Sequence, residues 1–229
     1  MNQSLPSAKK ILILGNGGRE NALAWALINS HGVEKVFVAP GNGGTEEIDK
    51  CTRLDIAETN VEKIIESCLE IQIDLVIIGP EAPLAAGISD KLRKKEIVVF
   101  GPGEDGAQLE ASKEWAKLLM NEAGIPTAKH WKANNLKDAL EIIKRSNHPL
   151  VIKVDGLAAG KGVTVPKNVE DSIKAVEEAF QGKFGIAGET IILEEMLTGP
   201  EVSIFALCDG TRMVLLPPAQ DHKRLMEGD

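Results

Sequence analysis

The stretch VIKVDGLAAGKGVTV, at positions 151–165, sets two lysines and three glycines between two β-branched runs. Glycines let a backbone approach a ligand closely, and amide N–H groups beside two ammonium groups suit a polyphosphate. The spacing is not GxxxxGK[ST], which excludes a Walker P-loop. A hairpin tip with solvated lysines remains the alternative. The residues concerned are Lys153, Lys161, Gly156, Gly160 and Gly162.

A second segment, Glu194–Leu197 (EEML), ends a predicted strand and is followed by Gly199, Pro200 and Glu201. A strand that runs into a loop can offer backbone groups to an adenine edge and a carboxylate to a ribose. Two edge-strand glutamates that serve solubility are the alternative.

A third segment, GNGGRE, follows the first predicted strand and opens a helix at Gly15–Glu20. Amides at a helix N-terminus bind phosphate, and the Arg19 guanidinium adds a bidentate donor. A dinucleotide fingerprint is rejected, because Glu20 stands where it needs glycine and Ala39 where the second strand should end in an acid. A plain tight turn remains the alternative.

Glu81 follows another strand, at the sheet edge where open α/β folds bind ligands. Its carboxylate could accept hydrogen bonds from an amine or a ribose. The alternative is a helix-start carboxylate that the helix dipole stabilises.

These segments need elements to hold them in place. Apolar strands alternate with helices up to residue 100, which predicts a parallel sheet covered on both faces. One long helix is expected over 104–122, and a hairpin around Asp209 and Gly210. The pattern predicts an N-terminal α/β domain at 1–126, a second unit at 127–193 and the start of a third at 194–229.

Composition narrows the function classes. The chain has 229 residues and a net charge of −8, with no basic stripe, which excludes duplex nucleic acid and anionic membranes as partners. The odd number of widely spaced cysteines predicts neither a disulfide framework nor a zinc site. Without a signal peptide or an apolar run of membrane length, a cytoplasmic location is expected.

Four segments taken in order resemble the ATP-grasp superfamily: SKEWAKLLMNEAGIPT, VIKVDGLAAGKGV, ILEEMLTGPEVS and QDHKR. ILILGNGGREN, VFVAPGNGGT, DLVIIGPEAPL and VVFGPGEDGAQLEASK narrow the resemblance to the phosphoribosylamine–glycine ligase family. The resemblance runs from about Lys10 to the last residue and covers roughly the first half of the family pattern.

The resemblance implies an enzyme that uses ATP to join glycine to 5-phosphoribosylamine through a glycyl phosphate, as a monomer. It implies an open, Rossmann-like parallel sheet, then an ATP-grasp lid, then the start of a truncated α+β subdomain. Magnesium is expected with ATP, with its ligands beyond residue 229 and none within this chain. Turnover by this chain alone is not expected.

The family motifs also imply residue roles. ATP contacts fall on Lys113, Lys153, Gly160, Lys161, Gly162, Glu194, Glu195, Leu197, Glu201 and Lys223, with Lys161 and Lys223 also catalytic. Substrate contacts fall on Gly17, Gly18, Arg19, Glu20, Glu81, Asp221 and His222. Many members have His where this chain has Asn21, an amide that cannot titrate near neutrality.

Two other readings stay open. One is a non-catalytic nucleotide- or phosphate-binding remnant of an ATP-grasp protein. The other is a different ATP-grasp carboxylate–amine ligase, against which the N-terminal segments argue.

Overall fold

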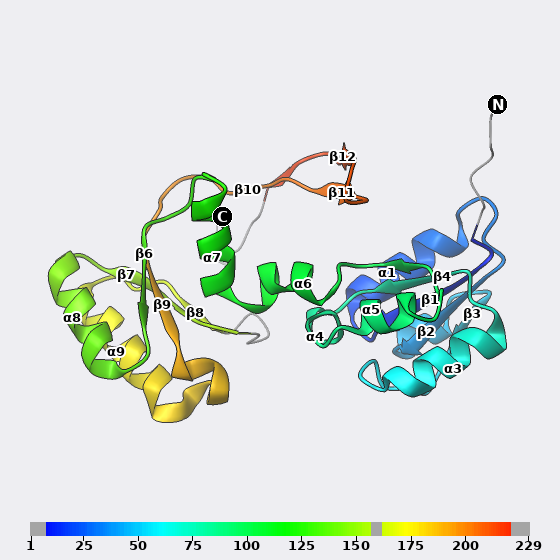
Figure 1. Ribbon diagram of the computed structural model, residues 1–229, viewed down its shortest axis with the longest axis horizontal. Helices are drawn as coiled ribbons and strands as arrows, with labels where there is room; N and C mark the ends of the chain where they lie inside the picture. Colours follow the sequence, from blue (N-terminus) through cyan, green and yellow to red (C-terminus); the bar gives the residue numbers. More distant parts are fainter. Residues whose placement is uncertain (1–7, 157–161, 221–229) are drawn as a thin grey trace.

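The computed structural model describes residues 8–156 and 162–220. The molecule is elongated, with a sheet near each end and helices between them (Figure 1). Within the described ranges no helix is both long and apolar enough to cross a membrane.

The first sheet is parallel and open, with strand order β3-β2-β1-β4-β5. It confirms the predicted α/β class with an N-terminal open parallel sheet. Its strands are β1 (Lys10–Gly15), β2 (Lys35–Pro40), β3 (Cys51–Arg53), β4 (Leu75–Ile78) and β5 (Val99–Phe100). Its helices are α1 (Gly18–Ile28), α2 (Gly43–Glu46), α3 (Val61–Ile71), α4 (Glu81–Ala85) and α5 (Ile88–Arg93).

Alternate residues of β1 enter two different cores, because side chains alternate between the faces of a sheet. Leu12 and Leu14 pack with residues of α3 and α5, and Ile11 and Ile13 pack with Ala24 of α1. The sheet is therefore covered on both faces, which leaves the loops after its strands as the place where polar groups gather.

The single helix expected over 104–122 is wrong: two helices, α6 (Glu104–Ala111) and α7 (Lys113–Glu122), replace it. Ser112 between them is extended, with φ −132° and ψ 117°, and its side chain accepts a hydrogen bond from the backbone N–H of Trp115. The serine thus caps a new helix and the chain changes direction there.

The second sheet is antiparallel, in the order β6-β9-β7-β8. Its strands are β6 (His130–Ala133), β7 (Leu150–Val154), β8 (Val163–Thr164) and β9 (Ile191–Glu195). One face packs on α8 (Leu136–Ser146) and α9 (Val169–Glu178). The other face meets α7. An ion pair of 2.7 Å between Lys132 of β6 and Glu114 of α7 joins the two. Two short helical segments, η1 (Ala179–Lys183) and η2 (Gly185–Glu189), precede β9.

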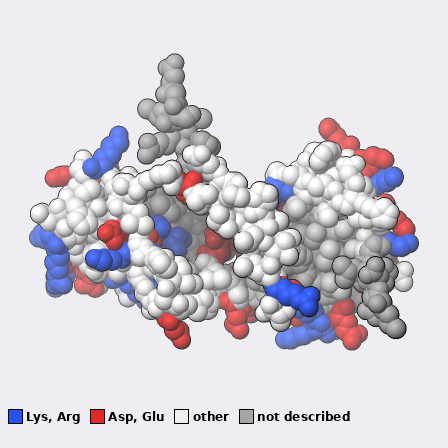
Figure 2. Space-filling model, turned by 90° about the horizontal axis from the view of Figure 1, so that it is seen from above, with Lys and Arg blue, Asp and Glu red and all other residues white. Residues whose placement is uncertain are grey.

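The chain then forms two small strand pairs. Strands β11 (Ala206–Cys208) and β12 (Met213–Leu215) confirm the hairpin predicted at Asp209 and Gly210. Strands β10 (Val202–Ser203) and β13 (Ala219–Gln220) pair beside it. Apolar side chains on the hairpin are exposed, and Figure 2 looks onto this side of the molecule and shows a broad uncharged surface in its middle.

Candidate functional site

Lys153 projects from β7 toward α7, because its neighbours Ile152 and Val154 point into the core under α8 and α9. Its Nζ lies 2.9 Å from Oε2 of Glu194 on the adjacent strand β9. The Glu194 side chain is only 7% exposed, whereas that of Lys153 is 29% exposed. The Glu194 carboxylate is therefore buried within this pair, whereas the Lys153 side chain is partly exposed and open to a ligand.

A second lysine, which the sequence analysis did not single out, shares that carboxylate. Lys117 of α7 places its Nζ 3.3 Å from the same Oε2 of Glu194, and both side chains are 7% exposed. The ammonium also donates to Thr127 Oγ1 at 2.8 Å and to the carbonyl oxygen of Ala128 at 3.2 Å. A lysine in a helix is normally exposed to solvent, so the sequence gives no sign of Lys117, and its burial in the structure is what distinguishes it.

Lys113 lies where α7 meets the start of the glycine-rich segment. Its backbone N–H donates to Asp155 Oδ1 at 2.6 Å, and its Nζ donates to the carbonyl oxygen of Gly156 at 3.1 Å. At the far end of the segment, the buried Gly162 accepts a hydrogen bond from the N–H of Val154 at 2.9 Å. Both ends of the segment are thus fixed near Lys113 and Lys153. Gly160 and Lys161 lie outside the described residues.

The EEML segment divides between the two faces of the second sheet. Glu194 faces Lys153, whereas alternation places Glu195 on the other face, opposite Leu150. The backbone N–H of Glu195 donates to the carbonyl oxygen of Lys129 at 2.8 Å. Leu197, beyond the strand, is 70% exposed. The adenine role predicted for these residues stays a prediction.

Of the other ATP and substrate residues predicted in the C-terminal part, the structure describes only Glu201. Glu201 is exposed. Asp221, His222 and Lys223 lie outside the described residues, so their roles stay predictions.

The GNGGRE turn gathers a second polar group at the end of β1. Arg19 Nη1 donates to the carbonyl oxygen of Gly79 at 2.7 Å and to Glu81 Oε1 at 3.2 Å. The side chains of Arg19 and Glu81 are 62% and 45% exposed, so the remaining guanidinium donors face outward. Gly18 is exposed at the start of α1 and has open space around its α-carbon. The structure thus brings Arg19 and Glu81 together beside the helix N-terminus.

Glu20, which the resemblance makes a substrate contact, points inward instead. It is 5% exposed, and its Oε2 accepts the backbone N–H of Gly17 at 2.6 Å. A Cβ added to Gly79 would lie 1.9 Å from Glu20 Oε1, so the carboxylate sits directly against that glycine. The carboxylate stabilises the turn that presents the amides, and any direct contact with substrate stays a prediction.

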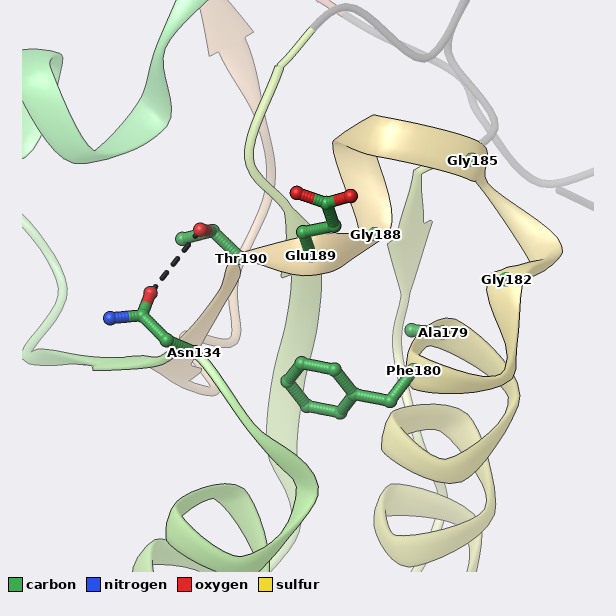
Figure 3. A pocket seen from close by; sticks show the side chains of 8 residues that line it. All are labelled: Asn134, Ala179, Phe180, Gly182, Gly185, Gly188, Glu189 and Thr190. Atoms are coloured by element: carbon green, nitrogen blue, oxygen red, sulfur yellow. Dashed lines mark hydrogen bonds between the residues drawn. The ribbon is translucent and has the colours of Figure 1, made fainter.

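These two groups lie in different parts of the molecule, the turn with the first sheet and the lysines with the second (Figure 1). A third feature, a cavity of about 720 Å³, opens beside η1 and η2. Asn134, Phe180, Glu189 and Thr190 line it, with Asn134 Oδ1 accepting from the Thr190 hydroxyl (Figure 3). None of the predicted site residues lines this cavity.

Metal-binding groups and cysteines were the remaining candidates for a reactive centre in the described part of the chain. No three His, Cys, Asp or Glu residues there are grouped to hold a metal ion. Cys51, Cys68 and Cys208 are free thiols, as the sequence predicts. Burial raises the pKa of the Cys68 thiol to about 11, which keeps it protonated and unreactive at neutral pH.

Comparisons with known proteins agree with this geometry. Residues 9–110 match the N domain, and residues 111–229 the ATP-grasp (A) domain, of the phosphoribosylglycinamide synthetase family. A curated phosphoribosylamine–glycine ligase of Nostoc is 51% identical over 220 residues, covering 96% of this chain and 52% of the relative. The chain therefore spans about half the length of that relative.

Solved structures give the same picture. The crystal structure of phosphoribosylamine–glycine ligase from Thermotoga maritima is 33% identical with a TM-score of 0.74, over 96% of this chain and 52% of that one. N5-carboxyaminoimidazole ribonucleotide synthetase, solved as an ADP complex, shares the fold at 21% identity and a TM-score of 0.73, over 98% and 57% of the two chains.

Proposed function

Because this chain belongs to the phosphoribosylglycinamide synthetase family, we propose that it binds ATP for the ligation of glycine to 5-phosphoribosylamine. In that reaction a glycine carboxylate oxygen attacks the γ-phosphorus of ATP, giving glycyl phosphate and ADP. The amine of phosphoribosylamine then attacks the acyl carbon, loses a proton and expels phosphate, leaving an amide. We assign this chemistry to the whole enzyme, and the binding of ATP to this chain.

One observation carries the proposal: the Lys153 ammonium is anchored on Glu194 beside the two fixed ends of a glycine-rich segment. Phosphoryl transfer depends on position and on charge neutralisation, with little covalent work for the protein. Lys113 and Lys153 would meet the triphosphate, with Lys161 and the amides of Gly160 and Gly162 closing over it as a lid.

The other roles follow the family resemblance and remain part of the proposal. Glu194, Glu195 and Leu197 would bind adenine, partly through their backbone, Glu201 the ribose, and Lys223 the reacting phosphates. The proposed domain limit at 126 is supported by the second sheet, whose first strand begins at His130, whereas the limit at 193 falls within β9 (Ile191–Glu195).

At the first sheet, we assign the phosphate of phosphoribosylamine to the turn at Gly17 and Gly18. The free donors of Arg19 and the helix amides would bind it. Glu81 would accept from the amine or ribose, with Asp221 and His222 nearby in the complete site.

Magnesium would arrive with ATP and neutralise phosphate charge when bound. Among the described residues, no group of three His, Cys, Asp or Glu fits the ion. Small-molecule substrates, a cytoplasmic location and a monomeric state complete the proposal. The three free cysteines support a reducing compartment such as the cytoplasm.

Calorimetric titration of the chain with ATP tests the proposal. We expect saturable binding that Lys153→Ala weakens about tenfold, the worth of one charge-assisted phosphate contact. Lys144→Ala is the matched control, because this exposed lysine lies on α8, behind the opposite face of the sheet. Absent binding, or equal losses in the two variants, would refute the assignment.

A further inference from the structure

Among the residues that the structure describes near the proposed ATP site, Lys117 is the one charged and deeply buried side chain that the residue roles above do not explain. It lies on the second turn of α7, facing the second sheet. We propose that Lys117 is a positioning residue: it shares Glu194 with Lys153 and so leaves the Lys153 ammonium available to a phosphate group. The inference rests on the proposed ATP site and adds a residue to it.

The geometry makes Glu194 the centre of a three-membered charge cluster. Its Oε2 is 3.3 Å from Lys117 Nζ and 2.9 Å from Lys153 Nζ. The Lys117 ammonium donates hydrogen bonds to Thr127 Oγ1 and the Ala128 carbonyl oxygen, and it forms an ion pair with Glu194. With its side chain only 7% exposed, Lys117 is held inside the protein by these three contacts.

The net charge of the cluster formed by Lys117, Glu194 and Lys153 explains how Lys117 would act on Lys153. Two ammonium groups and one carboxylate leave a surplus of one positive charge. Of the two lysine side chains, that of Lys153 is 29% exposed and that of Lys117 is 7% exposed, so only Lys153 can present the positive charge to a ligand. Without Lys117, the Lys153 ammonium would be the sole partner of a buried carboxylate, which would hold it more firmly and cancel its charge.

A purely structural role for Lys117 is the competing explanation, since the residue also ties α7 to the second sheet. The chain offers a matched control for that role. Lys132 of β6 makes the other ion pair between this sheet and α7, with Glu114 at 2.7 Å, and has no contact with Glu194. If Lys117 only joined the elements, removing either lysine would have the same effect on ligand binding.

The experiment compares ATP with adenosine, which lacks phosphates, by calorimetric titration of the intact chain. For Lys117→Met we expect ATP affinity to fall about tenfold, one charge-assisted contact, and adenosine affinity to change less than twofold. Lys117→Arg should recover most of the ATP affinity. Lys132→Met should leave the ratio of the two affinities unchanged. Circular dichroism and thermal melts of each variant establish that it is folded.

A second pair of variants keeps the test decisive if Lys117→Met unfolds. In a Glu194→Gln background no carboxylate competes for Lys153, and no buried anion is left unpaired. There, adding Lys117→Met should change the ATP-to-adenosine ratio less than twofold, because Lys117 acts through Glu194. An undiminished tenfold loss in that background would mean that Lys117 acts on phosphate directly, and would overturn the inference.

The remaining outcomes separate the two proposals. Equal losses of ATP and adenosine affinity in Lys117→Met, or no loss at all, overturn the role of Lys117 while wild-type binding of ATP stands. A wild-type chain that binds neither compound overturns the proposed ATP site itself, and the inference with it.

Discussion

Asp155 is expected to be the main attachment between the glycine-rich segment and helix α7. Its Oδ1 accepts the backbone N–H groups of Lys113 at 2.6 Å and Glu114 at 3.2 Å, and its Oδ2 accepts the Ser112 hydroxyl at 3.2 Å. The carboxylate thus caps the first turn of α7, although Asp155 lies 43 residues after Ser112 in the sequence.

The cost of removing this carboxylate can be worked from those contacts. Hydrogen bonds to a charged group contribute about 1.5–3 kcal/mol, and a negative charge at a helix N-terminus about 0.3–1 kcal/mol more. Ser112 still caps Trp115 in the variant, which limits the loss. We therefore expect Asp155→Ala to lower the free energy of unfolding by about 2–3 kcal/mol, and Asp155→Asn, which keeps one acceptor oxygen, by about 1 kcal/mol.

Thermal melts followed by circular dichroism check this expectation. At about 2–4 °C per kcal/mol for a chain of this size, Asp155→Ala should lower the Tm by roughly 4–12 °C. The control is Asp138→Ala in the first turn of α8, whose carboxylate accepts a hydrogen bond from the Asn135 side chain alone among the described residues. If the two alanine variants lose equal stability, or if the asparagine variant is as unstable as the alanine variant, the capping argument is refuted.

Three further predictions concern other parts of the chain. Arg19→Ala should weaken the binding of ribose 5-phosphate about tenfold by calorimetry, since it removes the bidentate donor at the turn. Gly79→Ala should lower the free energy of unfolding by about 1–3 kcal/mol in urea titrations, because its Cβ would displace the Glu20 carboxylate from the N–H it holds. Iodoacetamide at pH 8 should label the exposed Cys208 in the native chain and spare Cys68 until urea is added, because burial raises the pKa of Cys68 to about 11 and leaves roughly one thiolate in a thousand.

Their controls come from the same regions. Lys9→Ala removes an exposed ion pair and should leave ribose 5-phosphate binding unchanged, and an equal loss there would count against the Arg19 assignment. Gly43→Ala adds a Cβ that meets nothing within 4 Å, so comparable losses for the two glycines would contradict the role of Glu20. Rapid native alkylation of Cys68, identified by peptide mass spectrometry, would contradict its burial.

Local patterns in the sequence were enough for the parallel sheet and for the Asp209–Gly210 hairpin, because apolar runs and turn residues act over a few positions. The break between α6 and α7 was not predictable in this way. Its stabilising carboxylate, Asp155, comes directly after strand β7 of the second sheet. A helical pattern on both sides of Ser112 therefore looked continuous.

The residues of the candidate site also fall into those that the sequence identifies and those that only the folded structure brings together. Lys153 could be singled out because glycines and β-branched runs accompany it in sequence, and Lys113 through the family resemblance alone. Lys117 could not, since Glu194 and Thr127, the side chains that bury its ammonium, are brought to it only by folding. For Glu20 a local signal existed: it stands three residues after the Gly17 N-cap, the spacing of a capping box, and the structure uses it in that way.

A crystal structure of the chain with a non-hydrolysable ATP analogue and magnesium would show whether Lys113 and Lys153 bind the triphosphate. We predict that the triphosphate lies on the α7-facing side of the second sheet, with phosphate oxygens within about 3.2 Å of the Nζ atoms of Lys113 and Lys153. An analogue bound in the cavity beside Asn134 and Glu189, or at the Arg19 turn, with Lys153 still turned only to Glu194, would contradict it.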